Sequence, residues 1–111
     1  MLSKVLVRRD TSTMTKSHAE AAPLRQVLRL FALFGLPIRV VIFQRLARVP
    51  STAGELARGL PVSRTAIVQH LKLLEAAGLV AASVQGRRRV YGVRSRGLAP
   101  LVRWVTKYSS T

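Results

Sequence analysis

The chain has 111 residues, the length of one domain, and its 19 Lys and Arg against 4 Asp and Glu leave a formal net charge of +15. It contains no cysteine, which excludes a disulfide framework, a thiolate metal site and a cysteine nucleophile, and makes a reducing cytoplasm the expected compartment. Because 49% of the residues are hydrophobic, the chain can bury a core, and we expect a folded basic domain whose partner is a polyanion.

The distribution of residue types disfavours two further classes. General acid–base catalysis needs carboxylates and imidazoles in a cluster, and here they are scattered along the chain, so we expect no enzyme. These residues are Asp10, His18, Glu20, Glu55, His70 and Glu75. No run of apolar residues approaches the 18 that a membrane-spanning helix needs, so we expect no membrane partner.

Residues 1–20 are predicted to form a flexible arm, because they are rich in Ser, Thr and Lys and their second half shows no helical period. Within this arm, Met14 is a second candidate for the natural start of the chain. The folded domain is predicted to occupy residues 21–111.

A first helix is predicted from Ala21 to about Phe34, with Pro23 in its first turn. Apolar residues recur at every third or fourth position. They are Leu24, Val27, Leu28 and Phe31 on one side, and Leu30 and Leu33 on a second side. A small domain can hardly bury both sides by itself, so the pattern indicates a partner subunit.

Gly35 and Pro37 separate this helix from a second amphipathic helix, which runs to about Arg48. Thr52 and Glu55 have the spacing of a capping box, in which the two residues satisfy each other's backbone donors. This pattern predicts the start of a short third helix.

A fourth helix is predicted to begin after Ser63 as N-cap and to end at Gly78. Only residues 59–62 connect it to the third helix, and so short a connection indicates a helix-turn-helix. Its buried side is Ile67, Leu71 and Leu74. The predicted DNA contacts are Ser63 and the outward residues Arg64, Thr65, Val68, Gln69 and Lys72.

After Leu79 the apolar period becomes two, which predicts a β-hairpin whose second strand is Arg87 to Val93. Such a hairpin, or wing, is expected to reach phosphates or a minor groove. The predicted contacts at its tip are Arg87, Arg88 and Arg89. Alternation along the strand puts Arg87, Arg89 and Tyr91 on one face and Arg88 and Val90 on the other.

A last helix is predicted from about Ser95 to Tyr108, and with Trp104 it is too apolar for a free surface. Its apolar positions at helical spacing include Leu98, Leu101, Val102 and Val105. Together with Leu24, Val27, Leu28 and Phe31 of the first helix, they form the predicted dimer interface. The predicted fold is mainly α with a small β-hairpin, a winged helix-turn-helix that dimerises through its terminal helices.

Two sequence runs resemble the ArsR-type bacterial winged helix-turn-helix regulators. They are the Ser-x-x-x-(apolar)-x-Gln-His-Leu-Lys-x-Leu run that begins at Ser63, and the Gly-Arg-Arg-Arg-x-Tyr run that begins at Gly86. The resemblance extends over about Leu24 to Val105. It implies a homodimer whose terminal helices pack together and a regulator that represses its own operon by blocking the promoter.

The two metal sites familiar in that family lack their ligands here. Residues 50–55, at the start of the third helix, hold no cysteine, and residues 94–111 hold no Asp, Glu or His. We therefore expect no metal and no other cofactor, apart from a weak divalent-ion candidate at His18 and Glu20 in the arm. His70 is expected to pack or to contact a phosphate, and Val68 stands where the family commonly has Ser.

The predicted function is sequence-specific binding of double-stranded DNA by a dimeric regulator, a repressor, at an inverted-repeat operator. An RNA-binding or ribosome-associated protein is an alternative, but most of the aromatic residues occupy positions predicted to be buried. A non-specific architectural protein is another alternative, but the wing carries no apolar wedge that would kink a duplex. The operator sequence and the effector are not encoded in any recognisable motif.

Overall fold

The computed structural model describes residues 18–109, with side chains from residue 24 onward. The predicted arm, including Met14 and the side chains of His18 and Glu20, lies outside the described residues except for the backbone of residues 18–20. The elements in chain order are α2 (His18–Phe34), α3 (Pro37–Arg48), β1 (Ser51–Thr52), α4 (Ala53–Arg58), α5 (Arg64–Ala76), β2 (Val80–Gln85), β3 (Arg88–Val93), the 3-10 helix η1 (Ser95–Leu98) and α6 (Ala99–Ser109). The mainly helical fold with a small sheet is confirmed.

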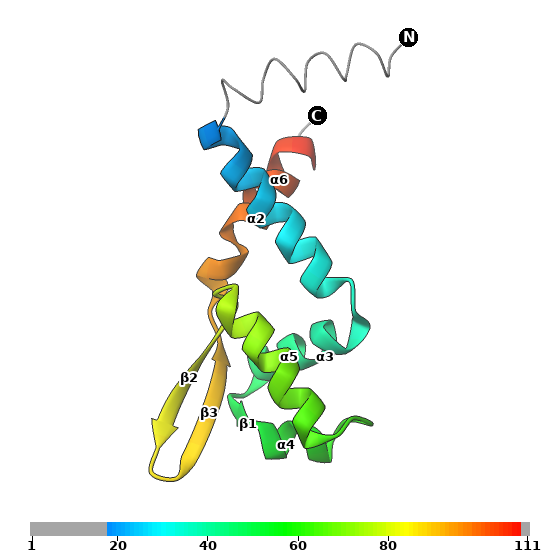
Figure 1. Ribbon diagram of the computed structural model, residues 1–111, viewed down its shortest axis with the longest axis vertical. Coiled ribbons are helices and arrows are strands. Elements are labelled where there is room, and N and C mark those ends of the chain that lie inside the picture. Colours follow the sequence, from blue (N-terminus) through cyan, green and yellow to red (C-terminus); the bar gives the residue numbers. More distant parts are fainter. Residues whose placement is uncertain (1–17, 110–111) are drawn as a thin grey trace.

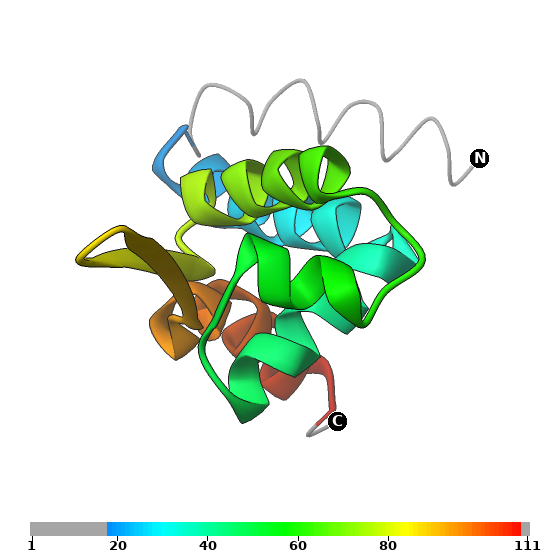
Figure 2. The same ribbon diagram turned by 90° about the horizontal axis from the view of Figure 1, so that it is seen from below.

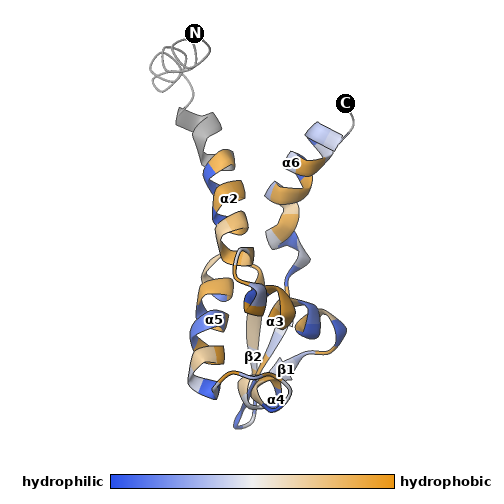
Figure 3. Cartoon of the chain, turned by 90° about the vertical axis from the view of Figure 1, so that its right-hand side faces the viewer, coloured by the Kyte–Doolittle hydropathy of each residue, from blue (hydrophilic) through white to orange (hydrophobic). Residues whose placement is uncertain are grey.

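The described residues form a head and two helical arms, α2 and α6 (Figures 1 and 3). These helical arms are not the flexible arm that was predicted for residues 1–20. The head consists of residues 37–93, which include α3, α4, α5 and the sheet. The arms are α2 and α6, which extend from the same side of the head and carry apolar residues along much of their length (Figure 3). The two helices of the predicted helix-turn-helix, α4 and α5, therefore lie at the opposite end from the free ends of the arms (Figure 1).

The core of the head is built around one side of α5. Ile67, Leu71 and Leu74 are each 0% exposed, as their helical spacing predicts. They pack with further fully buried residues from α3 and from the start of the wing, namely Ile42, Leu46, Leu79 and Val80. Because this stripe is fixed inward, the remaining sides of α5 are turned outward.

Local hydrogen bonds set both helices of the pair. The Ser63 hydroxyl accepts from the Ala66 N–H at 3.1 Å and caps α5. The capping box of α4 is confirmed, because Thr52 Oγ1 accepts from the Glu55 N–H at 3.1 Å and Glu55 Oε1 accepts from the Thr52 N–H at 2.8 Å.

The end of α5 has the predicted glycine cap. Gly78 adopts φ +77°, a left-handed conformation that favours glycine. Its N–H donates to the Glu75 carbonyl, and the Leu79 N–H donates to the Leu74 carbonyl, both at 3.0 Å, which is the Schellman pattern. Leu79 is fully buried, so the chain enters the wing from a fixed point.

The sheet has one strand more than the predicted hairpin. Its order is β1-β3-β2, and both pairings are antiparallel, with Ser51 opposite Tyr91 and Ala82 opposite Tyr91 from the other side. A two-residue strand is too short to show an alternating pattern, which is why the sequence did not indicate β1. The hairpin of β2 and β3 projects from the rest of the head (Figure 2).

Two helix boundaries differ from the sequence prediction. The first helix begins at His18, three residues before the predicted Ala21. The predicted last helix begins with the 3-10 turn η1, and α6 itself starts at Ala99. A Cβ at Gly97 would collide with the carbonyl oxygen of Gly78, so the close contact of η1 with the end of α5 requires a residue without a side chain.

The arms pack on each other through aromatic rings. Phe31 of α2 and Trp104 of α6 meet edge to face with ring centroids 5.4 Å apart. Within α6, the ring centroids of Trp104 and Tyr108 are 5.0 Å apart.

Among the described helices, none is long and apolar enough on its own to cross a membrane. The segments Leu24–Phe34 and Pro37–Arg48 reach the required length and apolar character only together, and a 95° bend separates them.

Candidate nucleic-acid interface

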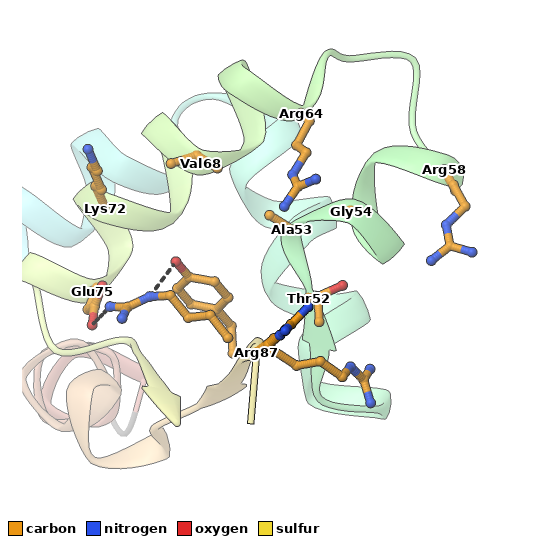
Figure 4. A pocket seen from close by; sticks show the side chains of 12 residues that line it. Thr52, Ala53, Gly54, Arg58, Arg64, Val68, Lys72, Glu75 and Arg87 are labelled. Carbon is orange, nitrogen blue, oxygen red and sulfur yellow. Dashed lines mark hydrogen bonds and ion pairs between the residues drawn. The ribbon is translucent and has the colours of Figure 1, made fainter. Parts of the chain in front are cut away.

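A basic groove lies between α5, the start of α4 and the wing, and has a volume of about 630 Å³ (Figure 4). Its lining contains six basic side chains and one carboxylate. The basic residues are Arg58, Arg64, Lys72, Arg87, Arg88 and Arg89, and the acid is Glu75. The groove therefore has a strong positive potential, which favours phosphate groups.

The residues of α5 that were predicted to contact DNA occupy two adjacent stripes. Arg64, Val68 and Lys72, spaced four apart, line the basic groove. Thr65 and Gln69 are exposed but do not line it, so they lie on the neighbouring outward stripe. Val68 is half-buried and packs partly against the core, which leaves part of its surface available in the groove.

Arg64 extends from α5 toward the start of α4 and the wing (Figure 4). A Cβ added at Gly54 would lie 4.0 Å from Cζ and Nη1 of Arg64, so the guanidinium passes directly over a residue without a side chain. The Arg64 guanidinium thus lies in the groove, between α5 and the wing, rather than extending along the axis of α5.

The wing is tied to both helices by ion pairs. Arg88 Nη2 lies 3.1 Å from Glu55 Oε1 of α4, and Arg89 Nη2 lies 3.4 Å from Glu75 Oε2 of α5. Arg89 Nε also donates to the Tyr91 hydroxyl at 3.0 Å, which places these two residues on one face as alternation predicts. The pairs are half-exposed, so solvent screens them and they serve mainly to orient the arginines.

Hydrogen bonding holds the Glu55 carboxylate in its ionised form. The Thr52 N–H and hydroxyl lower the pKa of Glu55 below its usual value, and the positive charge of Arg88 lowers it further. The hydrogen bond to the Tyr91 hydroxyl raises the pKa of Arg89 above its usual value, with a smaller contribution from Glu75. Glu55 and Arg89, one member of each wing ion pair, therefore stay charged through the physiological pH range.

The remaining cations of the groove have no acidic partner among the side chains of residues 24–109. Glu55 and Glu75 are the carboxylate side chains of residues 24–109, and both pair with the wing. Within this described range, Arg58, Arg64, Lys72 and Arg87 therefore form no ion pair. These four charges are available to an external anion.

The side chain of His70, on α5, is held by a hydrogen bond from the neighbouring helix α3. Arg39 Nε of α3 donates to His70 Nδ1 at 3.2 Å, and Arg39 Nη1 donates to the Leu33 carbonyl of α2 at 3.4 Å. Burial, followed by the charge of Arg39, lowers the pKa of His70, so the ring is neutral and accepts at Nδ1. Over residues 24–109, no three His, Asp or Glu side chains gather where a metal ion could bind.

The turn between α4 and α5 is clamped from α3. Arg45 Nη2 donates to the Gly59 carbonyl at 3.1 Å, and a Cβ at Gly59 would collide with the same guanidinium. This contact joins residues 14 positions apart and helps to fix the angle between the two helices.

The predicted dimer residues fall into two groups. Five are about half-exposed or more on the arms: Leu24 52%, Leu28 57%, Phe31 47%, Val102 56% and Val105 47%. Val27 is buried within the chain, and Leu98 and Leu101 pack partly against the core. These three residues therefore join the arms to each other and to the head.

The structure adds residues that sequence reasoning missed. Arg58, Gly54 and Tyr91 complete the lining of the basic groove, and Arg58 was detectable as an outward basic residue in the last turn of α4. Trp104 and Tyr108, which already made the last helix too apolar for a free surface in the sequence, extend the exposed apolar surface of the arms, at 37% and 56% exposure.

The known proteins that this chain resembles are helix-turn-helix transcriptional regulators. A helix-turn-helix domain family model matches residues 35–81. The chain is 54% identical over 63 residues to the HTH-type transcriptional regulator Rv2034 of Mycobacterium tuberculosis, covering 57% of this chain and 59% of the relative. It is 33% identical over 86 residues to the HTH-type transcriptional repressor SmtB of that species, covering 74% and 64%. The chain thus spans about three fifths of the length of these relatives.

Solved structures agree in fold and in family. An ArsR-like transcriptional regulator from Rhodococcus sp. RHA1 matches with a TM-score of 0.70 and 32% identity, over 78% of this chain and 82% of that one. The homodimeric winged helix-turn-helix DNA-binding domain of Mb0332 from Mycobacterium bovis matches with a TM-score of 0.69 and 26% identity, over 85% and 87%. The chain belongs to the ArsR/SmtB family of winged helix-turn-helix transcriptional regulators.

Proposed function

We propose that the protein is a sequence-specific DNA-binding transcriptional regulator that represses its target by occupying an inverted-repeat operator as a homodimer. The observation that carries this proposal is the basic groove, in which the capped end of α5 and the wing present unpaired cations to one side of the head. We place this activity in the cytoplasm.

Affinity is expected to come from phosphates. Arg58, Arg87 and Lys72 line the groove from α4, the wing and α5, so they can neutralise phosphates on both sides of an inserted helix. Each neutralised phosphate releases counterions, so the logarithm of the association constant should fall by about 0.9 per phosphate for each tenfold rise in salt.

Specificity is expected to come from the outward stripe of α5 and the groove stripe beside it. Gln69 is exposed two turns into the helix and is suited to a bidentate contact with adenine. Arg64, at the first helical position, is suited to guanine or to a phosphate next to the helix N-terminus.

The proposed dimer uses the exposed apolar surface of the arms. Phe31 of α2 contacts Trp104 of α6, which in turn contacts Tyr108. Leu24 lines one hollow together with Trp104 and Tyr108, and Leu28 is exposed on the same helix as Leu24. Isolated exposed apolar residues are common, but so many on two contacting helices indicate a protein partner. A second copy, related by a twofold axis, would place the two α5 helices in successive major grooves, about 34 Å apart.

The test begins with selection of bound duplexes from a random pool, followed by fluorescence anisotropy on the selected site, a scrambled duplex and a structured RNA. The proposal expects the selected site to bind at least about 1,000-fold more tightly than the scrambled duplex at physiological salt. Equal affinity for selected and scrambled duplexes would support an architectural role instead, and preference for RNA would support the RNA-binding alternative.

Single substitutions separate specificity from affinity. Gln69→Ala should lose about 1–3 kcal/mol of discrimination at one base position, whereas Gln44→Ala, an exposed glutamine on α3, should not. Arg87→Ala should weaken binding to all duplexes alike and lower the salt slope by about one, whereas Arg103→Ala on α6 should not. A uniform loss with Gln69→Ala would contradict the assigned role of α5.

A further inference from the structure

A second hollow of about 260 Å³ lies where the arms join the head, and it shares no lining residue with the basic groove. Gln26, Arg29 and Leu30 line it from α2, and Ala77 lines it from the end of α5. Arg96 of η1 and Pro100 of α6 complete the opposite side. Figure 1 shows η1 and the start of α6 close to the end of α5, with α2 alongside.

The polar part of this hollow is entirely cationic or neutral. Arg29 and Arg96 reach it from two different elements, and neither has a carboxylate partner within residues 24–109. Two guanidinium groups that line one hollow can both donate charge-assisted hydrogen bonds to an anion held between them. The first turn of α6 contains no acidic residue, so the positive end of that helix also remains uncompensated by its own sequence.

The rest of the lining is apolar. Leu30 is only 3% exposed, and with Ala77 and Pro100 it provides a hydrocarbon surface beside the two arginines. The volume is below the range of about 300–1,000 Å³ that is typical of drug-sized ligands. A matching ligand therefore carries one anionic group and a body of a few carbon atoms.

The hollow is connected to α5 through backbone contacts. The Arg94 N–H donates to the Leu79 carbonyl at 2.8 Å, just after the glycine cap of α5. Gly97 lies so close to the Gly78 carbonyl that it has no room for a side chain. Arg96 is thus fixed to the end of α5, whereas Arg29 belongs to an arm, and a ligand that binds both arginines links these two parts.

We propose that this hollow binds a small organic anion, a carboxylate or phosphate with a short apolar body, held by Arg29 and Arg96. Bound there, the anion changes how α5 is set relative to α2 and so acts as an effector of DNA binding. The binding site is inferred from the residues that line the hollow, whereas the effector role rests on the proposed function.

The first experiment measures binding without DNA. Inorganic phosphate, acetate and hexanoate are titrated against the full chain at constant ionic strength, and thermal unfolding is recorded. At ten times the dissociation constant, a bound anion should raise Tm by about 5 °C. A stronger response to hexanoate identifies a carboxylate ligand, and a stronger response to phosphate identifies a phosphorylated one.

Matched arginine variants decide whether the hollow is responsible. Arg29→Gln and Arg96→Gln should each raise the dissociation constant at least tenfold, because each removes a charge-assisted hydrogen bond. Arg96→Lys should recover part of the affinity, and Arg94→Gln, an exposed arginine two residues away that does not line the hollow, should bind as the wild type does. A response that never saturates, or one reduced equally by Arg94→Gln, would overturn the site.

The second experiment tests the effector role. The dissociation constant for the selected duplex is measured with and without saturating anion, and it should change at least threefold in the wild type and not in Arg96→Gln. Saturable binding without any change in DNA affinity would overturn the effector role and leave the site intact. If no duplex is bound at all, the proposed function fails, whereas the binding result of the first experiment still holds.

Discussion

The head and the arms differ in where their large apolar side chains and their basic side chains gather. In the head, seven large apolar residues are almost fully buried, and much of the surface around α5 and the wing is arginine and lysine. In the arms, large apolar side chains such as Leu28, Val102 and Trp104 remain between 37% and 57% exposed, although Val27 and Leu30 are buried. A surface of basic side chains without ion pairs among residues 24–109 favours binding of a polyanion, and an exposed apolar surface favours binding of another protein. This difference supports the proposal that the head binds DNA and that the arms bind a second copy.

The largest loss of stability is expected from a substitution that leaves a cavity in the core of the head. Leu71→Ala removes a side chain that is 0% exposed, and it should lower the free energy of unfolding by about 2–5 kcal/mol. Leu73→Ala, on the same helix but 45% exposed, should cost far less. Urea unfolding of both variants measures the difference, and similar losses would mean that α5 is not seated as described.

Substitutions on the exposed surface of the arms should instead weaken the association of two copies into a dimer. Phe31 is 47% exposed and would be buried in the dimer, so Phe31→Ala should cost about 2 kcal/mol in each copy and about 4 kcal/mol per dimer. Leu36→Ala, 44% exposed in the turn that leaves α2, should leave the dimer constant unchanged. Sedimentation equilibrium measures both, and a Phe31→Ala dimer as tight as the wild type would remove the arms from the interface.

Local patterns predicted the head well. The spacing of Ile67, Leu71 and Leu74 indicated the buried side of α5, and the Thr52 and Glu55 pair indicated where α4 begins. These features depend on residues within one or two turns of each other, which is the range over which periodicity and capping act.

Contacts between residues that are far apart in the sequence could not be predicted from these local patterns. The Arg39–His70 hydrogen bond and the Arg88–Glu55 ion pair join positions 31 and 33 apart, and nothing in the local pattern marks them. In the arms, α2 is apolar on two sides, so the sequence alone did not show that Val27 would pack inward and Leu28 outward. Only the position of α6 decides between them.

A smaller effect is expected at the base of the wing. Thr52→Ala removes the hydroxyl that caps α4 and should cost about 1 kcal/mol of stability. The Glu55 N–H loses its acceptor, whereas the bond from the backbone N–H of residue 52 to the Glu55 carboxylate, the partner of Arg88, is retained. Thr106→Ala, at an exposed position in α6, should change the midpoint of thermal unfolding little. If the two variants were equally stable, the capping box would contribute nothing to the head.

The smallest effect is expected from pH. The pKa of His70 is lower in the folded chain than its ordinary 6.5, so the unfolded chain binds the proton more readily. The stability from neutral His70 is present above about pH 6.5 and declines as the pH falls toward the folded-state pKa. His70→Gln should therefore reduce the loss of stability between pH 7.5 and 5.5, a range above the lowered pKa of Glu55. An unchanged pH profile in urea unfolding would contradict the contact with Arg39.

The division between head and arms is tested most directly by half-site spacing. Two duplexes carry the selected half-sites with centres about 34 Å apart, or with five more base pairs, which rotates one half-site by about half a turn. Anisotropy titration should show binding at least about 100-fold weaker for the rotated duplex with the wild type, and nearly equal, weak binding of both duplexes with Phe31→Ala. Equal affinity of the wild type for the two duplexes would contradict a dimer that places two heads on one face of DNA.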